Sequence, residues 1–290
     1  MARIAIIGGG SIGEALLSGL LRAGRQVKDL VLAERMPERA KYLADTYSVR
    51  VTSVTDAVEN ATFVVVAVKP ADVESVIGEL ARAAAAAEID SAEQVFVTVA
   101  AGITITYFES KLPAGTPVVR AMPNAAALVG AGVTALAKGR FVTEPQLEEV
   151  SALFDSVGGV LTVPESQMDA VTALSGSGPA YFFLMVEALV DAGVAAGLSR
   201  QVAADLTAQT MAGSAAMLLE RMDSDRPVEG EALGMRADAT AAQLRATVTS
   251  PGGTTAAALR ELERGGLRVA VDAAVQAAKR RSEQLRITSE

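Results

Sequence analysis

Three glycines between residues 8 and 13 form the strongest candidate for chemistry in this 290-residue chain. Gly8, Gly10 and Gly13 fit the pattern Gly-x-Gly-x-x-Gly, after an apolar run and before a helical pattern. There Gly8 permits a tight turn, Gly10 lets a pyrophosphate approach the backbone, and Gly13 lets the helix pack on the strand. The helix begins at Ser11 and Ile12, and its N-terminus is expected to face the phosphates. This spacing predicts a dinucleotide-binding site.

Two neighbouring charges leave the identity of the dinucleotide open. Glu34 follows the second predicted strand about 20 residues beyond the glycines, where an acidic residue binds the ribose hydroxyls of NAD. Arg35 stands next to it, where an arginine receives the 2′-phosphate of NADP. Both NADPH and NADH therefore remain candidates, and the alternative is a pair of solvated loop charges.

Two further strand ends place polar residues at the same edge of the predicted sheet. Ala67-Val68-Lys69-Pro70 follows the fourth strand, and Met122-Pro123-Asn124 follows the sixth. Loops at the carboxyl ends of parallel strands line the ligand crevice. Lys69 is therefore expected near the cofactor or a substrate carboxylate, unless it is only a surface lysine, and Asn124 near the nicotinamide. Arg120 is expected to pair with a carboxylate, either of a ligand or of the protein itself.

A loop late in the chain has the composition of an anion site. In Ser250-Pro251-Gly252-Gly253-Thr254-Thr255, two glycines permit a turn that aims backbone amides outward, and three hydroxyls add donors at the start of the next helix. A small carboxylate would fit this loop. The alternative interpretation is a capped joint between two helices.

A second cluster of small residues, Ser175-Gly176-Ser177-Gly178-Pro179, lies inside a predicted helix. Small side chains let another backbone or a flat cofactor ring come close. A kink at Pro179 explains the cluster equally well.

The elements that would position these residues fall into two halves. Continuous apolar runs separated by helical patterns predict a doubly wound, Rossmann-type α/β sheet over residues 1–163. An Ala-, Leu- and Met-rich composition predicts an all-α domain over residues 164–290. The predicted strands are Arg3 to Ile7, Asp29 to Ala33, Val49 to Thr52, Phe63 to Val68, Val95 to Ala100, Pro117 to Ala121, Val133 to Ala137 and Val160 to Val163. The predicted helices are Ser11 to Ala23, Pro37 to Tyr47 and Asp72 to Ala87, then 165–195, 200–221, 239–248, 254–263 and 266–286, with an irregular connection over Asp223 to Ala237.

The composition narrows the chemistry and the partners. The net charge is −8, which argues against binding nucleic acid. The chain has no His and no Cys, so zinc fingers, thiol nucleophiles and histidine triads are excluded, and no metal site is expected. The N-terminus lacks the pattern of a signal peptide, which favours a cytoplasmic protein. The apolar stretch Ala170 to Val186 is interrupted and predicts a buried helix at a subunit interface, not a membrane span.

Taken together, these motifs resemble the pyrroline-5-carboxylate reductase family over essentially the whole chain, and Ser250-Pro251-Gly252-Gly253-Thr254-Thr255 is the most specific of them. The resemblance implies a Rossmann domain, a helical dimerisation domain, and a homodimer that can assemble into a ring of five dimers. It also implies reduction of 1-pyrroline-5-carboxylate, a cyclic imine carboxylate, to L-proline by NADPH or NADH in the last step of proline biosynthesis.

The same resemblance implies the roles of individual residues. The substrate carboxylate lies in the loop formed by Ser250, Gly252, Gly253, Thr254 and Thr255, and the Thr255 hydroxyl bonds the imine nitrogen. Lys69 and Asp238 fall near the substrate. One departure is Thr240-Ala241, which stands where family members commonly have His-Pro.

Two other functions compete with this interpretation. A β-hydroxyacid dehydrogenase also joins a Rossmann domain to helices, but its catalytic lysine lies in the helical domain, and residues 165–264 contain no lysine. A nicotinamide-binding sensor needs no turnover. A turnover assay separates the sensor from an enzyme.

Overall fold

The computed structural model describes residues 2–86, 94–224 and 236–287, with the backbone alone at 84–86, 224 and 236–239. Contacts within the chain divide it into two compact units. The first unit combines Met1–Pro179 with Val275–Glu290, and the second is Ala180–Ala274. The chain therefore leaves the first unit near Pro179 and returns to it at Val275.

An eight-stranded sheet forms the centre of the first unit, in the order β3-β2-β1-β4-β5-β6-β7-β8. All neighbouring strands are parallel except β6 and β7, which are antiparallel. All eight predicted strands are present, and the doubly wound fold class is confirmed. The strands are β1 (Ile4–Ile7), β2 (Leu30–Ala33), β3 (Arg50–Thr52), β4 (Phe63–Val66), β5 (Val95–Thr98), β6 (Val118–Pro123), β7 (Gly132–Lys138) and β8 (Gly158–Thr162).

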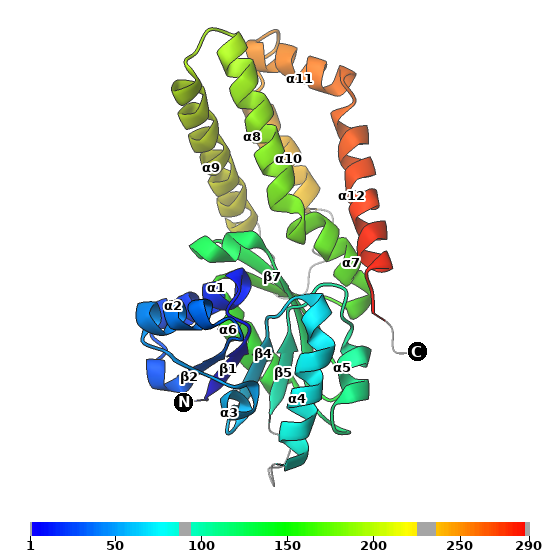
Figure 1. Ribbon diagram of the computed structural model, residues 1–290. Coiled ribbons are helices and arrows are strands. Elements are labelled where there is room, and N and C mark those ends of the chain that lie inside the picture. The colour runs from blue at the N-terminus through cyan, green and yellow to red at the C-terminus, as the bar shows by residue number, and fades with distance from the viewer. Residues whose placement is uncertain (1, 87–93, 225–235, 288–290) are drawn as a thin grey trace. The chain divides into compact units, whose positions relative to one another are not determined.

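Helices cover both faces of this sheet (Figure 1). Side chains alternate between two separate cores along the central strands: in β1, Ile4 and Ile6 pack on one face, while Ala5 and Ile7 pack on the other. This double burial explains why the central strands are mostly continuous apolar runs instead of alternating apolar and polar residues. The helices of this unit are α1 (Ser11–Arg22), α2 (Pro37–Tyr47), α3 (Val54–Val58), α4 (Val73–Ala86), α5 (Ile105–Lys111), α6 (Glu144–Asp155) and α7 (Met168–Val171).

The predicted helix over 165–195 is interrupted. After α7 the backbone forms a π-helical turn, Thr172–Gly176, and the long helix α8 (Gly178–Ala195) begins only afterwards. Pro179 is the second residue of α8, where its missing N–H costs no hydrogen bond. The cluster of small residues thus marks a junction between two helices.

The second unit is helical, as predicted for this half of the chain (Figure 1). Its elements are α9 (Arg200–Ser224), α10 (Arg236–Thr247) and α11 (Thr254–Arg264), together with most of α8 and the first part of α12 (Leu267–Gln284). Helix α9 therefore ends later than predicted, and helix α10 begins earlier than predicted. The rest of the predicted irregular connection, residues 225–235, lies outside the described residues.

Helix α8 exposes large apolar side chains in the single chain: Phe182 and Phe183 are each 61 % exposed, and Leu184 is 67 % exposed. The sequence predicts that this helix is buried at a subunit interface, where a second chain would cover these side chains. The run Glu165–Ala195 is also long and apolar enough, by length and composition alone, to cross a membrane. An apolar surface of this size indicates that something other than this chain's own interior covers the helix.

Candidate active site

A cavity of about 610 Å³ opens at the carboxyl edge of the sheet. It lies beside β1, which has β2 on one side and β4 on the other, so the strand order changes direction here. Doubly wound folds bind dinucleotides at this point. Seven of the predicted cofactor residues line it together: Gly8, Gly10, Glu34, Arg35, Ala67, Val68 and Lys69. These residues come from three separate segments of the chain, and the fold brings them together around one cavity.

The three glycines of the turn meet different constraints. Gly8 has a φ of +103°, and a Cβ there would lie 2.7 Å from the Ala67 carbonyl oxygen. A Cβ at Gly13 would run into the Gly8 carbonyl. Gly10 is unlike both, because its φ of −66° is ordinary and a Cβ there would meet no atom within 4 Å. The chain itself does not require a glycine at position 10, so the open space beside it is a cradle that a side chain would fill.

The N-terminus of α1 completes this cradle. Gly10 is the N-cap residue, and among the described residues no side chain caps the helix. Helix α1 begins at Ser11, followed by Ile12 and then Gly13, so its first backbone amides remain available to an anion. This arrangement fits the pyrophosphate of a dinucleotide.

Glu34 points at the glycine turn. Its Oε2 accepts a hydrogen bond of 2.8 Å from the Gly9 amide, and its Oε1 accepts one of 2.8 Å from the Met36 amide. The carboxylate therefore braces the turn from the β2 side. It still lines the cavity, so its negative charge acts on any ribose or phosphate bound there.

Arg39, a residue of α2, also holds the glycine turn in place. Arg39 donates from Nε to the Gly9 carbonyl at 2.7 Å and pairs with Glu14, which also accepts a 2.9 Å bond from the Tyr47 hydroxyl. Burial alone raises the pKa of Glu14, but the hydrogen bonds from Arg39 and Tyr47 outweigh it and hold that pKa below the usual value. Glu14 thus stays ionised and keeps Arg39 against the turn.

Arg35 is held by an acidic residue that the sequence analysis did not single out. Its Nη2 lies 2.9 Å from Oδ1 of Asp72, and both residues line the cavity. The arginine side chain is 76 % exposed, so it is free to exchange partners. Asp72 stands only three residues after Lys69, at the same strand end, and that position is the signal that would have found it.

Lys69 and Pro70 begin the short turn between β4 and α4. Lys69 is exposed and lines the cavity, while Pro70 opens the 3₁₀ turn Pro70–Asp72. Ser53, Ser75 and Glu79 also line the cavity, although no motif in the sequence distinguishes them from other polar residues.

Met122 and Asn124 lie at the end of β6, outside the lining of this cavity. The Asn124 side chain accepts a 3.2 Å hydrogen bond from the Val133 amide through Oδ1, and donates a 3.4 Å bond from Nδ2 to the Ser175 hydroxyl. Ser175 belongs to the π-helical turn. The structure therefore brings Asn124 and the cluster of small residues together.

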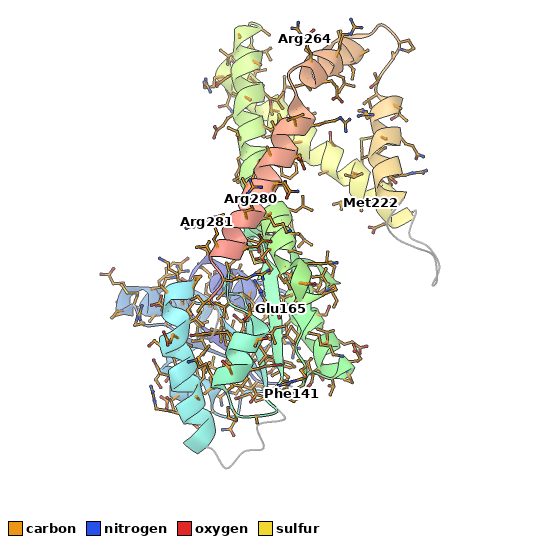
Figure 2. The ribbon with its side chains drawn as sticks, turned by 90° about the vertical axis from the view of Figure 1, so that its right-hand side faces the viewer. Phe141, Glu165, Met222, Arg264, Arg280 and Arg281 are labelled. Atoms are coloured by element: carbon orange, nitrogen blue, oxygen red, sulfur yellow. The ribbon has the colours of Figure 1, made fainter. Side chains whose placement is uncertain are left out.

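Arg120 pairs with a carboxylate of the protein. Its side chain is 3 % exposed, and Nη1 lies 3.3 Å from Oε1 of Glu165, which also accepts a 2.7 Å bond from the Ile105 amide. Glu165, labelled in Figure 2, opens the short turn Glu165–Gln167 that leads into α7. Of the two expectations for Arg120, the internal partner is the one observed.

The loop Ser250 to Thr255 belongs to the second unit and links α10 to α11. Gly252 has a φ of +70°, and the Gly253 amide bonds the Ser250 carbonyl at 3.1 Å. Gly253 is the N-cap of α11, and no described side chain caps that helix, so the amides at Thr254 and Thr255 remain available. Ser250 and Thr254 are exposed and Thr255 is half-buried.

Two other predicted positions lie in α10. Asp238 is a residue of this helix, but its side chain lies outside the described residues. Thr240 is 3 % exposed and Ala241 is exposed, so the position where the family commonly has His is an interior one.

Comparison with known proteins agrees with both units. The family described as pyrroline-5-carboxylate reductase dimerisation matches residues 165–285, and the family described as NADP oxidoreductase coenzyme F420-dependent matches residues 3–102. A pyrroline-5-carboxylate reductase of Mycobacterium tuberculosis is 85 % identical over 100 % of this chain and 99 % of its own. One of Corynebacterium melassecola is 44 % identical over 98 % of this chain and 99 % of its own.

Solved structures agree as well. A pyrroline-5-carboxylate reductase of Coxiella burnetii has a TM-score of 0.86 and 34 % identity, covering 99 % of each chain. A pyrroline carboxylate reductase of Plasmodium falciparum, described with NADP bound, has a TM-score of 0.78 and 28 % identity over 98 % of each chain. With the glycine turn, the cavity and the helical half in place, these matches show that the chain belongs to the pyrroline-5-carboxylate reductase family.

Proposed function

We propose that this chain reduces 1-pyrroline-5-carboxylate to L-proline with NADPH or NADH, the last step of proline biosynthesis. The proposal is supported by the 85 % identity, over the whole chain, to a protein named pyrroline-5-carboxylate reductase, and by the cavity that Gly8, Gly10 and Lys69 line at the carboxyl edge of the sheet. When bound, the reduced nicotinamide would supply a hydride to the imine carbon of a substrate whose ring nitrogen is already protonated. Residues 1–163 bind the dinucleotide, and residues 164–290 bind the substrate and form the dimer.

In this proposal the loop Ser250 to Thr255 binds the substrate carboxylate. The free amides at the start of α11 and the hydroxyls of Ser250 and Thr254 donate to the carboxylate oxygens. The Thr255 hydroxyl accepts a hydrogen bond from the protonated ring nitrogen, which orients the imine. Lys69 and Asp238 are further candidates for substrate contact. A protonated imine is already electrophilic, so orientation is a larger need than a strong base, and a chain without His or Cys can supply it.

The test is turnover of racemic pyrroline-5-carboxylate by the purified protein, followed by the loss of reduced-nicotinamide absorbance with NADPH and with NADH. Turnover with either cofactor supports the proposal. Cofactor binding without turnover would contradict it and would favour the nicotinamide-binding sensor.

Replacing Thr255 by Ala is expected to lower kcat/KM for pyrroline-5-carboxylate by about tenfold to a hundredfold, the loss of one charge-assisted hydrogen bond. Thr255→Ser keeps the hydroxyl and is the matched control, expected within about threefold of the wild type. Unchanged kinetics in Thr255→Ala would remove this hydroxyl from the mechanism.

Arg35 and its two acidic neighbours are expected to set the ratio of kcat/KM for NADPH to that for NADH. Arg35→Ala removes the partner of the 2′-phosphate and should lower this ratio by about tenfold. Asp72→Asn frees Arg35 from its ion pair and should raise the ratio by about two- to fivefold, a small effect because the pair is exposed. A ratio that moves in neither variant would place the 2′-phosphate elsewhere.

We further propose that a second copy of the chain covers the exposed apolar side chains of α8, which makes the protein a homodimer. The match to a dimerisation family over residues 165–285 supports this. A ring of five dimers and a cytoplasmic location belong to the same proposal, and light scattering of the purified protein tests the assembly. With a net charge of −8, the homo-oligomer is proposed to bind neither a membrane nor a nucleic acid.

A further inference from the structure

The π-helical turn Thr172–Gly176 packs directly on the end of β6. A Cβ at Gly176 would lie 2.8 Å from the Cε atom at the end of the Met122 side chain, so the turn and the end of β6 are in close contact. The turn is held by the Ser177 amide, which bonds the Thr172 carbonyl at 2.9 Å. Single π turns inside helices are rare and occur frequently at functional sites. This one places Ser175 at the carboxyl edge of the sheet.

The hydrogen bonds of Asn124 determine which way the Ser175 hydroxyl can donate. The Val133 amide can only donate, so it assigns Oδ1 of Asn124 to that side and Nδ2 to the Ser175 side. The Ser175 oxygen therefore accepts from Asn124, and its single proton is left to donate elsewhere. Among the residues that the structure describes, none accepts that proton.

The position of this hydroxyl matches one half of a dinucleotide site. The order β3-β2-β1-β4-β5-β6 is that of two mononucleotide-binding halves, and a dinucleotide lies across their junction. The cavity holds Glu34 and Arg35, corresponds to the adenosine half, and reaches as far as the end of β4 at Lys69. The ends of β5 and β6, beyond it in the strand order, then belong to the nicotinamide half, where Met122, Asn124 and Ser175 lie.

We propose that Ser175 donates its hydroxyl proton to the carboxamide oxygen of the bound nicotinamide, and that Asn124 is the positioning residue that orients this hydroxyl. The inference rests on the proposed function, because it assigns a contact to the same cofactor. Asn124 then acts on the nicotinamide through Ser175, since both ends of its own amide are already bonded within the chain.

Calorimetric titration with two ligands tests the proposal without turnover. NADPH carries the nicotinamide, whereas 2′-phospho-ADP-ribose keeps the adenosine half and lacks it. Ser175→Ala should weaken NADPH binding by about three- to tenfold, the loss of one hydrogen bond, and leave 2′-phospho-ADP-ribose binding unchanged. Ser175→Thr keeps the hydroxyl and should restore most of the NADPH affinity. Ser110→Ala is the control, because that hydroxyl bonds the Tyr107 carbonyl within α5.

Asn124→Asp gives a sharper test of the positioning role. A carboxylate still accepts from the Val133 amide, but it cannot donate to Ser175 and instead takes that proton for itself. Asn124→Asp should therefore weaken NADPH binding as much as Ser175→Ala does, and the double variant should lose no more than either single one.

The outcomes separate this inference from the function on which it rests. Ser175→Ala with unchanged NADPH affinity, or with equal losses for both ligands, overturns the inference while wild-type turnover of pyrroline-5-carboxylate keeps the function. Additive losses in the double variant overturn the role of Asn124. A wild-type protein that neither binds NADPH nor turns over the imine overturns both.

Discussion

Gly10→Val is expected to weaken binding of NADPH and NADH by about a hundredfold and to leave the fold intact. The reason is that the space beside Gly10 is empty in the protein alone, so a side chain there meets the pyrophosphate and not the chain. Added methyl groups in a closely packed site cost about 1–3 kcal/mol, and each 1.4 kcal/mol is about tenfold in affinity. Gly10→Ala should therefore lie between the wild type and Gly10→Val.

The measurement is cofactor affinity by calorimetry, paired with the urea midpoint of unfolding. Gly159→Val is the matched control, because a Cβ at Gly159 also meets nothing within 4 Å but lies on β8, away from the cavity lining. The control should bind cofactor like the wild type. Equal affinity in Gly10→Val and the control would place the pyrophosphate elsewhere, and a lowered urea midpoint would show that Gly10 has a structural role.

Asp169→Ala is expected to destabilise the protein by about 3 kcal/mol at neutral pH. Asp169 is 1 % exposed in α7, where Oδ1 accepts a 2.6 Å bond from the Ser282 hydroxyl and Oδ2 pairs with Arg286. These partners lie 113 and 117 residues away, at the end of α12 and just beyond it. The carboxylate thus ties the returning end of the chain to the first unit; Figure 2 labels Arg280 and Arg281 near this end of α12.

The ionisation of Asp169 should make the free energy of unfolding depend on pH. Burial by itself raises the pKa of Asp169, but hydrogen bonds from Ser282 and Arg286 and the positive charges of Arg286 and Arg120 outweigh it and leave that pKa below the usual value. A carboxyl whose pKa falls on folding adds stability above its unfolded pKa, near 3.9, and loses it as the pH drops through the folded value. The stability difference between wild type and Asp169→Asn should therefore be full at pH 7 and shrink below about pH 4.

Urea unfolding of the wild type and of Asp169→Asn at pH 7 and at about pH 3 measures this difference in stability. Asp45→Asn, which alters an exposed carboxylate on α2, is the control and should change stability by less than about 0.5 kcal/mol. A difference that stays constant from pH 7 to pH 3 would show that the ionised carboxylate is not what stabilises this junction.

The amino-acid sequence alone determined the strands, the glycine turn and the division into an α/β half and a helical half. These features depend on local patterns: an apolar run buried on both faces, or a glycine between a strand and a helix, has the same consequence wherever it occurs. The loop Ser250 to Thr255 was recognisable for the same reason, since its glycines and hydroxyls are adjacent in the chain.

Only the tertiary structure decided what the polar side chains near the site do. Glu34 was expected beside a ribose, but its carboxylate also holds the Gly9 amide, and Arg35 is paired with Asp72. Asn124 meets Ser175 across 51 residues of sequence, and Asp169 meets Ser282 across 113. A sequence pattern specifies the backbone over one helix or strand, whereas these contacts depend on which elements the fold places side by side. The exposed face of α8 extends the same principle, because its burial depends on a surface that a single chain does not contain.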